Sequence, residues 1–317
     1  MAKPRITIIG LGRTGTSLGL AIKKANSDVE LVGHDKESRA GQAAQKTGAF
    51  DRIEWNLPNA LDSAGLVILA MPLPGTRETI DVLARELVPG VIVTDTAALK
   101  TPVLEWAAAL PEGVQFVGGH PIISPRRAGD PAGADLFTDS VYCLTPATSA
   151  AANAVQIVST MVNLVGAKAL FLDAREHDGL VTGVEHVPYL LSLALLRAAT
   201  TSGAWRDLSQ VAGEDYRRAT DLAAEEAEGR RALLFQNRED VSRWIAAVED
   251  ALADLREAID RQDAAQFDEW AGDARSAREA WLKGEVGAAP ALDASDLRPS
   301  LSRMLLGGLA PRGNKKK

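Results

Sequence analysis

Six short apolar runs in the first 150 residues constrain the fold more than any other feature of this chain. They read "RITIIG", "VELVGHD", "LVILAMP", "VIVTDT", "VQFVGGH" and "VYCLTP", and stretches with helical spacing separate them. Most of these runs are rich in Val, Ile and Leu and lack polar alternation, which is typical of strands buried on both faces of a parallel sheet. The sequence therefore predicts an α/β first half built on a doubly wound parallel sheet.

The second half has a different character. Residues 174–283 are dominated by Ala, Leu, Glu, Arg and Asp at helical spacing, which predicts an all-α domain. Its segment "LVTGVEHVPYLLSLALLRAAT" is apolar nearly all round, which indicates a helix buried in a bundle or between subunits, and Pro188 should bend it. We expect domains at residues 1–170 and 171–284, followed by a flexible basic tail at 285–317 that ends in "PRGNKKK".

Composition narrows the class of function. The 35 basic and 42 acidic residues give a net charge of −7, which argues against a broad nucleic-acid surface. The single cysteine, Cys143, excludes an internal disulfide and a thiolate cluster for zinc, so we expect no metal site. The N-terminus lacks a signal-peptide core, and no uncharged apolar run of membrane-spanning length occurs. We expect a cytoplasmic enzyme of small molecules with no nucleic-acid or membrane partner.

A glycine-rich loop follows the first apolar run. Gly10 permits a tight turn, Gly12 lets a pyrophosphate approach the backbone, and Gly15 lets helix and strand pack closely. An acidic residue, Asp35, follows Gly15 by 20 positions at the end of the second run, which suits a hydrogen bond to a ribose 2′-hydroxyl. We therefore expect a dinucleotide to be bound by Gly10, Gly12, Arg13, Thr14, Gly15 and Asp35.

The carboxylate of Asp35 favours NAD, because it would repel the 2′-phosphate of NADP. NADP remains the alternative, since Lys36, Ser38 and Arg39 offer phosphate contacts if Asp35 turns outward. Ligands of open α/β sheets lie beyond the carboxyl ends of the strands, so Met71, Pro72 and Thr96 are candidates to line the nicotinamide side. Ordinary turn chemistry explains each of these last three residues equally well.

His120, in "VGGHPIISPRR", closes the fifth apolar run at the same edge as the glycine loop. A histidine at a strand end is more often a structural residue with satisfied hydrogen bonds than a functional one. Here two glycines precede the imidazole and a proline fixes the backbone after it. This context favours a histidine that faces the nicotinamide and accepts a proton.

The sequence resembles the prephenate and arogenate dehydrogenase family of tyrosine biosynthesis over about residues 4–250. The resemblance rests on an ordered set of motifs: "GLGRTGTSLGLAI", "DTAALK", "GGHPIIS", "GADLF", "YCLTP", "EHDGLVTGVEHVPYLLSLAL" and "LLFQNRE". It implies a Rossmann domain followed by an all-helical domain that forms a homodimer, with the active site between them.

The resemblance also implies the reaction, which is the oxidative decarboxylation of a cyclohexadienol carboxylate. Aromatisation drives this reaction, so the protein needs chiefly a base for the C4 hydroxyl, groups that bind carboxylates, and an aligned nicotinamide. His120 matches the family's catalytic histidine and would act as the neutral base. His186 matches a helical histidine near the substrate, with a buried structural histidine as the alternative, while His177 would fix a helix start and an interdomain contact.

Two positions depart from the family pattern. Ala98 stands where the family has a serine that helps to hold the histidine and the substrate hydroxyl, and Asp221, in "YRRATD", stands where an arginine grips a substrate carboxylate. Arginine suits bidentate capture of carboxylates. The remaining candidates for the substrate-binding region are Ala98, Arg126, Arg127, Arg217 and Tyr189, with solvated or interdomain salt bridges as the alternative for the arginines.

Two other functions stay open from the sequence. One is a related dehydrogenase of another hydroxy or imino acid, although residues 174–203 lack the lysine that hydroxy-acid enzymes would need. The other is a nucleotide-binding relative with impaired catalysis, which Ala98 and Asp221 suggest. The missing donor and arginine also leave the choice between prephenate and arogenate open.

Overall fold

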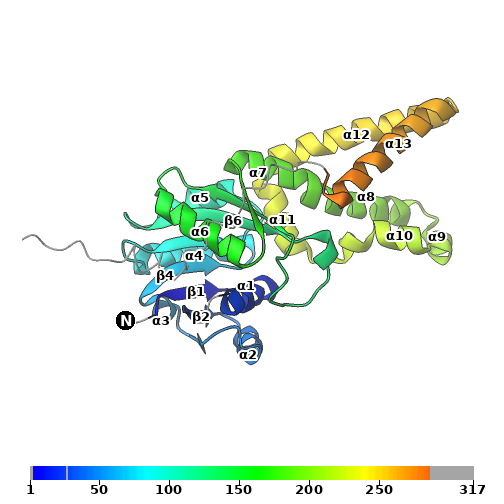
Figure 1. Cartoon of the computed structure of the whole chain (residues 1–317). Coiled ribbons are helices and arrows are strands. Elements are labelled where there is room, and N and C mark those ends of the chain that lie inside the picture. The colour runs from blue at the N-terminus through cyan, green and yellow to red at the C-terminus, as the bar shows by residue number, and fades with distance from the viewer. Residues whose placement is uncertain (1–2, 26–27, 286–317) are drawn as a thin grey trace, which may run out of the picture. The chain divides into compact units, whose positions relative to one another are not determined.

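The computed structural model describes residues 3–25 and 28–285. Their contacts form two compact units, one up to Asn237 and one from Arg238 on, which are described separately below. The first unit contains an eight-stranded sheet in the order β3–β2–β1–β4–β5–β6–β7–β8 (Figure 1). The strands are β1 Arg5–Ile9, β2 Glu30–His34, β3 Arg52–Ile53, β4 Ala64–Leu69, β5 Ile92–Asp95, β6 Gln115–Ile122, β7 Val141–Pro146 and β8 Lys168–Phe171.

All six apolar runs form strands, and the predicted fold class is confirmed. Two short strands, β3 and β8, add to the six. The sheet is parallel except between β6 and β7, which pair antiparallel with His120 opposite Cys143. The segment between these two strands holds only the 3-10 turn Pro125–Arg127, so it lacks the crossover helix that a parallel connection needs.

Helices cover both faces of the sheet. The residues of β4 show why: Leu66 and Ile68 pack into one hydrophobic cluster with α1 and α6, whereas Val67 and Leu69 pack into the other with α4 and α5. Both side-chain directions are therefore apolar, as the sequence predicted. The helices of this layer are α1 Arg13–Ala25, α2 Ser38–Lys46, α3 Leu57–Leu61, α4 Leu73–Glu86, α5 Thr101–Ala107 and α6 Ala152–Leu164.

The strand order reverses between β1 and β4, since the chain runs outward from β1 through β2 on one side and through β4 on the other. In sheets of this kind a crevice opens at the carboxyl ends of the two strands on either side of the reversal. The glycine loop follows β1 and Ala70–Pro72 follows β4. The fold thus brings the two predicted cofactor-binding segments to one edge.

A buried ion pair joins β5 to β6. Lys100 and Asp95 are both fully buried, and the Lys100 ammonium forms a salt bridge with the Asp95 carboxylate. The same ammonium donates to the carbonyl of Gly119 at 2.6 Å, and the second carboxylate oxygen of Asp95 accepts the Gly119 N–H at 2.9 Å. The backbone N–H and C=O of Gly119, the residue before His120, are therefore both fixed.

The described elements after β8 are all helical. In the first unit they are α7 Ala174–Val181, α8 Val187–Thr201, α9 Trp205–Val211, α10 Glu214–Ala219, a 3-10 turn at Asp221–Ala224, and α11 Ala227–Gln236. A π-helical turn, Thr182–His186, joins α7 to α8 immediately before Pro188. Because proline has no N–H and its ring crowds the preceding turn, the regular hydrogen-bond ladder is interrupted where the sequence predicted a bend.

The continuous helical stretch Ala174–Thr201 is long and apolar enough to cross a membrane by length and composition alone. Only a third of its most apolar window is buried, and Leu191, Leu193 and Leu195 are exposed. These side chains are therefore not buried in a bundle within the described residues, and their burial between subunits stays a prediction.

The second unit is a helical pair. α12 Arg238–Asp260 and α13 Ala264–Lys283 pack against each other, and Asp263 caps α13 by accepting the N–H of Gln266 at 3.0 Å (Figure 1). The domain boundaries expected at residues 170 and 284 remain proposals, because the strands end at Phe171 whereas the contacts divide at Asn237. Of the expected tail, residues 286–317 lie outside the described residues.

We predict that Lys100→Met destabilises the protein by about 3–5 kcal/mol, because it leaves the buried Asp95 carboxylate without its cation. Urea unfolding followed by circular dichroism measures this loss. The matched control is Lys23→Met, which removes a half-exposed salt bridge to Asp51 and should cost less than about 1 kcal/mol. Equal losses in the two variants would contradict a structural role for the buried pair.

Candidate active site

The glycine loop combines two tightly packed glycines with one open position. Gly10 has a φ of +93°, and a Cβ there would lie 2.4 Å from the Ala70 carbonyl oxygen. A Cβ on Gly15 would lie 1.9 Å from the Gly10 carbonyl oxygen, whereas a Cβ on Gly12 would have no atom within 4 Å. Chain packing therefore requires Gly10 and Gly15, while Gly12 leaves free space beside the N-terminus of α1, as a bound pyrophosphate needs.

Asp35 lies at the carboxyl end of β2 and turns toward the glycine loop. One carboxylate oxygen accepts the N–H of Leu11 at 2.7 Å, and the other accepts the N–H of Glu37 at 2.8 Å. The side chain thus does not take the outward position that the NADP alternative requires. Its place beside the loop is the one that the sequence predicted for a ribose-binding carboxylate.

A crevice of about 470 Å³ opens at this edge of the sheet. Seven predicted residues line it together with neighbours from the same loops and from α11: Gly12, Arg13, Thr14, Ala70, Met71, Pro72, Leu73, Thr96, Ala97, Ala98, Glu225, Glu226, Gly229, Arg230 and Leu233. The loops after β1, β4 and β5 form one side and α11 forms the other. The structure therefore brings together the predicted nicotinamide-binding residues and a helix that the sequence did not implicate.

His120 is buried, with 6% of its surface exposed. Its Nδ1 lies 3.1 Å from Nε2 of His177, and its Nε2 lies 3.8 Å from a carboxylate oxygen of Glu185. Burial, followed by the nearby His177, Lys100 and His186, holds the pKa of His120 well below the ordinary histidine value. The imidazole is therefore neutral at pH 7, as a general base must be.

His177, which the sequence predicted to fix a helix start and an interdomain contact, lies within α7. It is fully buried, and its Nδ1 lies 2.9 Å from a carboxylate oxygen of Asp178. Asp178 also accepts the backbone N–H groups of Lys100 at 2.7 Å and Thr101 at 2.8 Å. Burial acts to raise the pKa of Asp178, but the hydrogen bonds from His177, Lys100 and Thr101 outweigh it and hold the pKa below its ordinary value.

The π-helical turn carries two further ionisable groups. Burial raises the pKa of Glu185, against the opposing effect of Arg230. His186 is 1% exposed, and within the described residues neither of its ring nitrogens has a hydrogen-bond partner. Burial and then Arg230 lower the pKa of His186 to about 4, so this second imidazole is also neutral. A neutral imidazole with two unsatisfied nitrogens is suited to bind a polar ligand group.

Arg230 is the cation that the sequence did not identify. It lines the crevice from α11, pairs with the Glu225 carboxylate at 2.7 Å, and donates to the Glu185 carbonyl at 3.2 Å. Its guanidinium also lies over the ring of Tyr189, 5.5 Å from the centroid. The signal available was the pair of arginines in "EGRRALLFQNRE", just before a recognised motif. Arg230 links the crevice to the turn that carries Glu185 and His186.

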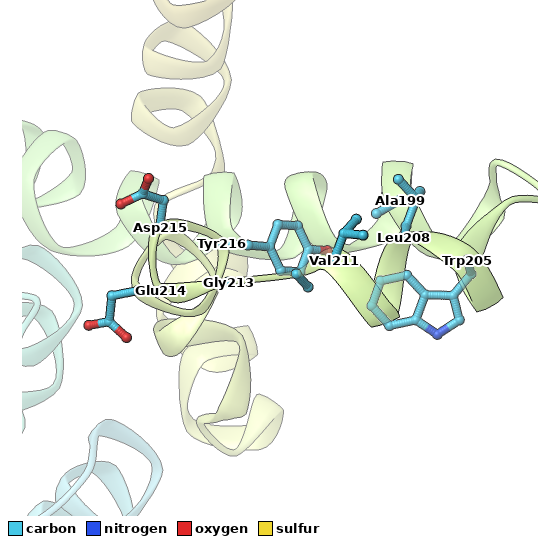
Figure 2. A pocket seen from close by; sticks show the side chains of 9 residues that line it. Ala199, Trp205, Leu208, Val211, Gly213, Glu214, Asp215 and Tyr216 are labelled. Carbon is cyan, nitrogen blue, oxygen red and sulfur yellow. The ribbon is translucent and has the colours of Figure 1, made fainter.

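A second cavity, of about 450 Å³, lies between α8, α9 and α10 (Figure 2). Trp205 and Tyr216 lie in its wall with their ring centroids 6.3 Å apart, and Leu208 and Val211 complete an apolar side. Its lining shares no residue with the crevice at the sheet edge. None of the predicted site residues lines this second cavity.

Comparison with known proteins gives the family. The model for the nucleotide-binding domain of prephenate dehydrogenase matches residues 18–171, and the model for its dimerization domain matches residues 173–272. The chain belongs to the prephenate dehydrogenase family. The predicted family and the nicotinamide-dinucleotide cofactor are thereby confirmed.

Individual proteins that the chain resembles are prephenate dehydrogenases, in agreement with the family models. The chain is 32% identical to prephenate dehydrogenase of Lactococcus lactis subsp. cremoris (strain MG1363) over 67% of its own length and 62% of that protein. It is 26% identical to prephenate dehydrogenase of Bacillus subtilis (strain 168) over 91% of its own length and 79% of that protein. The solved structure of A. aeolicus prephenate dehydrogenase in complex with hydroxyphenyl propionate and NAD+ shares the fold, with a TM-score of 0.78, 22% identity, and coverage of 88% of this chain and 98% of that one.

The three arginines that the sequence proposed for substrate binding take different places. Arg126 and Arg127 lie in the 3-10 turn after β6, and the guanidinium of Arg13 donates to the Arg127 carbonyl at 3.1 Å, so this turn lies beside the glycine loop. Arg217 lies in α10, where its exposed side chain pairs with Glu214 at 2.9 Å and approaches Asp221 at 4.0 Å. The structure thus does not bring Arg217 to the crevice, and its role stays a prediction.

We predict that Gly12→Ala leaves the protein folded but weakens dinucleotide binding about tenfold or more, because the added methyl group occupies the free space beside the loop. Isothermal titration with NAD measures the affinity, and thermal unfolding measures the stability. Gly15→Ala is the matched variant, and it should lower stability itself, because its methyl group overlaps the Gly10 carbonyl. Wild-type affinity in a folded Gly12→Ala protein would contradict the assigned site.

Proposed function

We propose that this protein catalyses the NAD-dependent oxidative decarboxylation of a cyclohexadienol carboxylate, prephenate or arogenate, in tyrosine biosynthesis. One observation carries the proposal beyond family membership: His120 is a buried, neutral imidazole whose Nδ1 is occupied by His177 and whose Nε2 points to the turn that carries Glu185. Arg230 connects that turn to the crevice of the glycine loop. The turn that carries Glu185 thus contacts both the proposed base and the cation on the crevice wall, although His120 is not itself among the residues that line the crevice.

The residues present fit a nicotinamide dinucleotide. The free space at Gly12 accommodates the pyrophosphate, Asp35 stands beside the loop for the ribose, and Met71, Thr96 and Ala98 line the crevice where the nicotinamide would lie. When bound, this cofactor accepts a hydride from C4 of the substrate. The inward orientation of Asp35 supports NAD over NADP.

The protein's own groups supply acid–base chemistry and positioning. His120 takes the proton of the C4 hydroxyl through Nε2, which its lowered pKa leaves free at neutral pH. Arg230 binds a substrate carboxylate, since its guanidinium lies on the crevice wall and the family's arginine is replaced by Asp221. The ring carboxylate departs as CO2 and the ring becomes aromatic, so no further group is needed to drive the reaction.

The acidic lining favours arogenate. Glu225 and Glu226 line the crevice beside Arg230. Arogenate carries an ammonium group next to its side-chain carboxylate, whereas prephenate carries a neutral keto group, so a carboxylate beside an arginine gives the first an ion-pair partner and gives the second no donor. Ala98 lies in the crevice where the family has a serine. The missing hydroxyl donor would serve either substrate equally, so its loss does not favour one of them.

The test of the proposed reaction is the absorbance of the reduced dinucleotide after the protein is mixed with substrate and cofactor. We expect turnover of a cyclohexadienyl acid, with arogenate preferred to prephenate and NAD preferred to NADP. The kcat/KM should stay constant through neutral pH and fall only at acidic pH, because the pKa of His120 is lowered and the base must be neutral.

His120→Asn should lower kcat by about 10²–10⁴-fold and leave the dissociation constant of NAD unchanged, because it removes only the base. Binding of NAD without turnover of either acid by the wild-type protein would favour the alternative of a non-catalytic relative. A variant that keeps wild-type kcat would show that His120 is not the base.

Arg230→Gln should lower kcat/KM for the cyclohexadienyl acid by about 10–100-fold, as expected for the loss of a charged hydrogen bond, and leave NAD binding unchanged. Steady-state kinetics measure the effect. Arg85→Gln, at an exposed position of α4, is the matched control. Arg217→Gln is the competing variant: a larger loss there than at Arg230 would move the carboxylate-binding role to α10.

We also propose a cytoplasmic homodimer formed through the helical part. The second family model is a dimerization domain, and Leu191 and Leu195, one turn apart on the same face of α8, are exposed, as is Leu193 on another face. Light scattering should report twice the 33.6 kDa chain mass at micromolar concentration. Leu191→Glu with Leu195→Glu should shift the protein toward monomer without loss of helix content, and a monomeric wild-type protein would contradict the dimer.

A further inference from the structure

We propose that His177 and Asp178 are positioning residues that hold His120 in the tautomer with the proton on Nδ1 and the lone pair on Nε2. This inference rests on the proposed function for its consequence, because the lone pair on Nε2 is what accepts the substrate proton. The tautomer itself is a property of the protein without substrate. It follows from the donor and acceptor roles along a chain of three side chains.

The assignment of hydrogen-bond donors and acceptors begins at Asp178. The backbone N–H groups of Lys100 and Thr101 can only donate, so the two carboxylate oxygens of Asp178 that face them must accept. The oxygen that binds Lys100 is also the one 2.9 Å from Nδ1 of His177. These contacts hold Asp178 as a carboxylate, which has no proton to give. Nδ1 of His177 must therefore carry the hydrogen of this bond.

The next role belongs to His177. In its neutral form, His177 with the hydrogen on Nδ1 has a lone pair on Nε2. This Nε2 lies 3.1 Å from Nδ1 of His120, within hydrogen-bond distance, and both rings are buried. Because Nε2 of His177 is the acceptor of this hydrogen bond, Nδ1 of His120 must be its donor. Nδ1 of His120 is therefore the protonated nitrogen.

The last role is at Nε2 of His120. With the hydrogen on Nδ1, the neutral ring presents a lone pair at Nε2, on the side of Glu185. The 3.8 Å between this nitrogen and the Glu185 carboxylate is longer than a hydrogen bond, so Nε2 is not already engaged there. The ring orientation is held from the other side as well, because Asp95 and Lys100 fix the Gly119 peptide that precedes it.

The reaction depends on the fraction of His120 that is in the tautomer with its lone pair on Nε2. An isolated neutral imidazole distributes its hydrogen over both nitrogens, and any fraction with the hydrogen on Nε2 cannot accept a proton there. A carboxylate that fixes the tautomer of a catalytic histidine is known to contribute orders of magnitude to kcat in hydrolases with a Ser-His-Asp arrangement. In this protein a second histidine stands between the carboxylate and the base.

The direct test is nitrogen NMR of the wild-type protein labelled with ¹⁵N in histidine only. The chain has four histidines, so one spectrum separates them, and substitution of each in turn assigns the signals. We expect His120 and His177 each to show a protonated Nδ1 and an unprotonated Nε2 at neutral pH. A protonated Nε2 on His120 would overturn the proposal, and this result does not depend on whether any substrate is turned over.

Two variants of His177 separate positioning from packing. His177→Gln keeps a side-chain carbonyl that can accept from Nδ1 of His120, whereas His177→Leu fills the space without an acceptor. We expect His177→Leu to lower kcat about 10²–10³-fold with the KM for NAD unchanged and with His120 redistributed toward the Nε2-protonated tautomer. His177→Gln should retain kcat within about tenfold and keep the wild-type tautomer of His120.

Equal kcat in the Gln and Leu variants, with an unchanged His120 tautomer, would overturn the proposal. His34→Gln is the matched control, since it removes a buried imidazole that binds only the Glu54 carbonyl among the contacts described. If His177→Leu does not fold, the tautomer of His120 in the wild-type protein and in His177→Gln still tests the proposal. Absence of turnover in the wild-type protein, together with the expected tautomers, would contradict the proposed reaction and leave the positioning inference standing.

Discussion

The buried ion pair between Asp95 and Lys100 is the interaction on which the candidate site depends. It engages the backbone N–H and C=O of Gly119 in β6, so the part of the strand that carries His120 cannot shift without breaking contacts to a buried charge pair. The N–H of the same Lys100 is bound by Asp178. One residue thus connects the sheet to the first helix of the helical part.

Burial decides the chemistry that the histidines can perform. His120 and His186 are buried, and the cations near them, Lys100 and Arg230, oppose a further positive charge. The pKa values of His120 and His186 are therefore lowered, and both imidazoles are neutral at physiological pH. Asp178, whose oxygens accept two backbone N–H groups, gives the buried Nδ1 of His177 a partner, whereas the ring nitrogens of His186 have none within the described residues.

The interrupted helix carries two further ionisable groups, which Arg230 links to the crevice. A regular helix through Pro188 would place its side chains at even steps, whereas the π-helical turn Thr182–His186 changes the direction of Glu185 and His186 relative to the helix before it. Arg230 then approaches this turn from α11 and lies over Tyr189. In the proposed function, substrate recognition accordingly rests on the helical part, whereas the glycine loop belongs to the sheet.

The sequence by itself determined the local features: six strands, the glycine spacing at residues 10, 12 and 15, Asp35 beside that loop, and His120 at a strand end, because each depends on near neighbours and on the period of the chain. It did not reveal the antiparallel pairing of β7, the contact of His177 with His120, or the place of Arg230. Those are decided by tertiary packing. His120 and His177 are 57 positions apart, and the carbonyl that Arg230 binds is 45 positions away, so no local pattern records either contact.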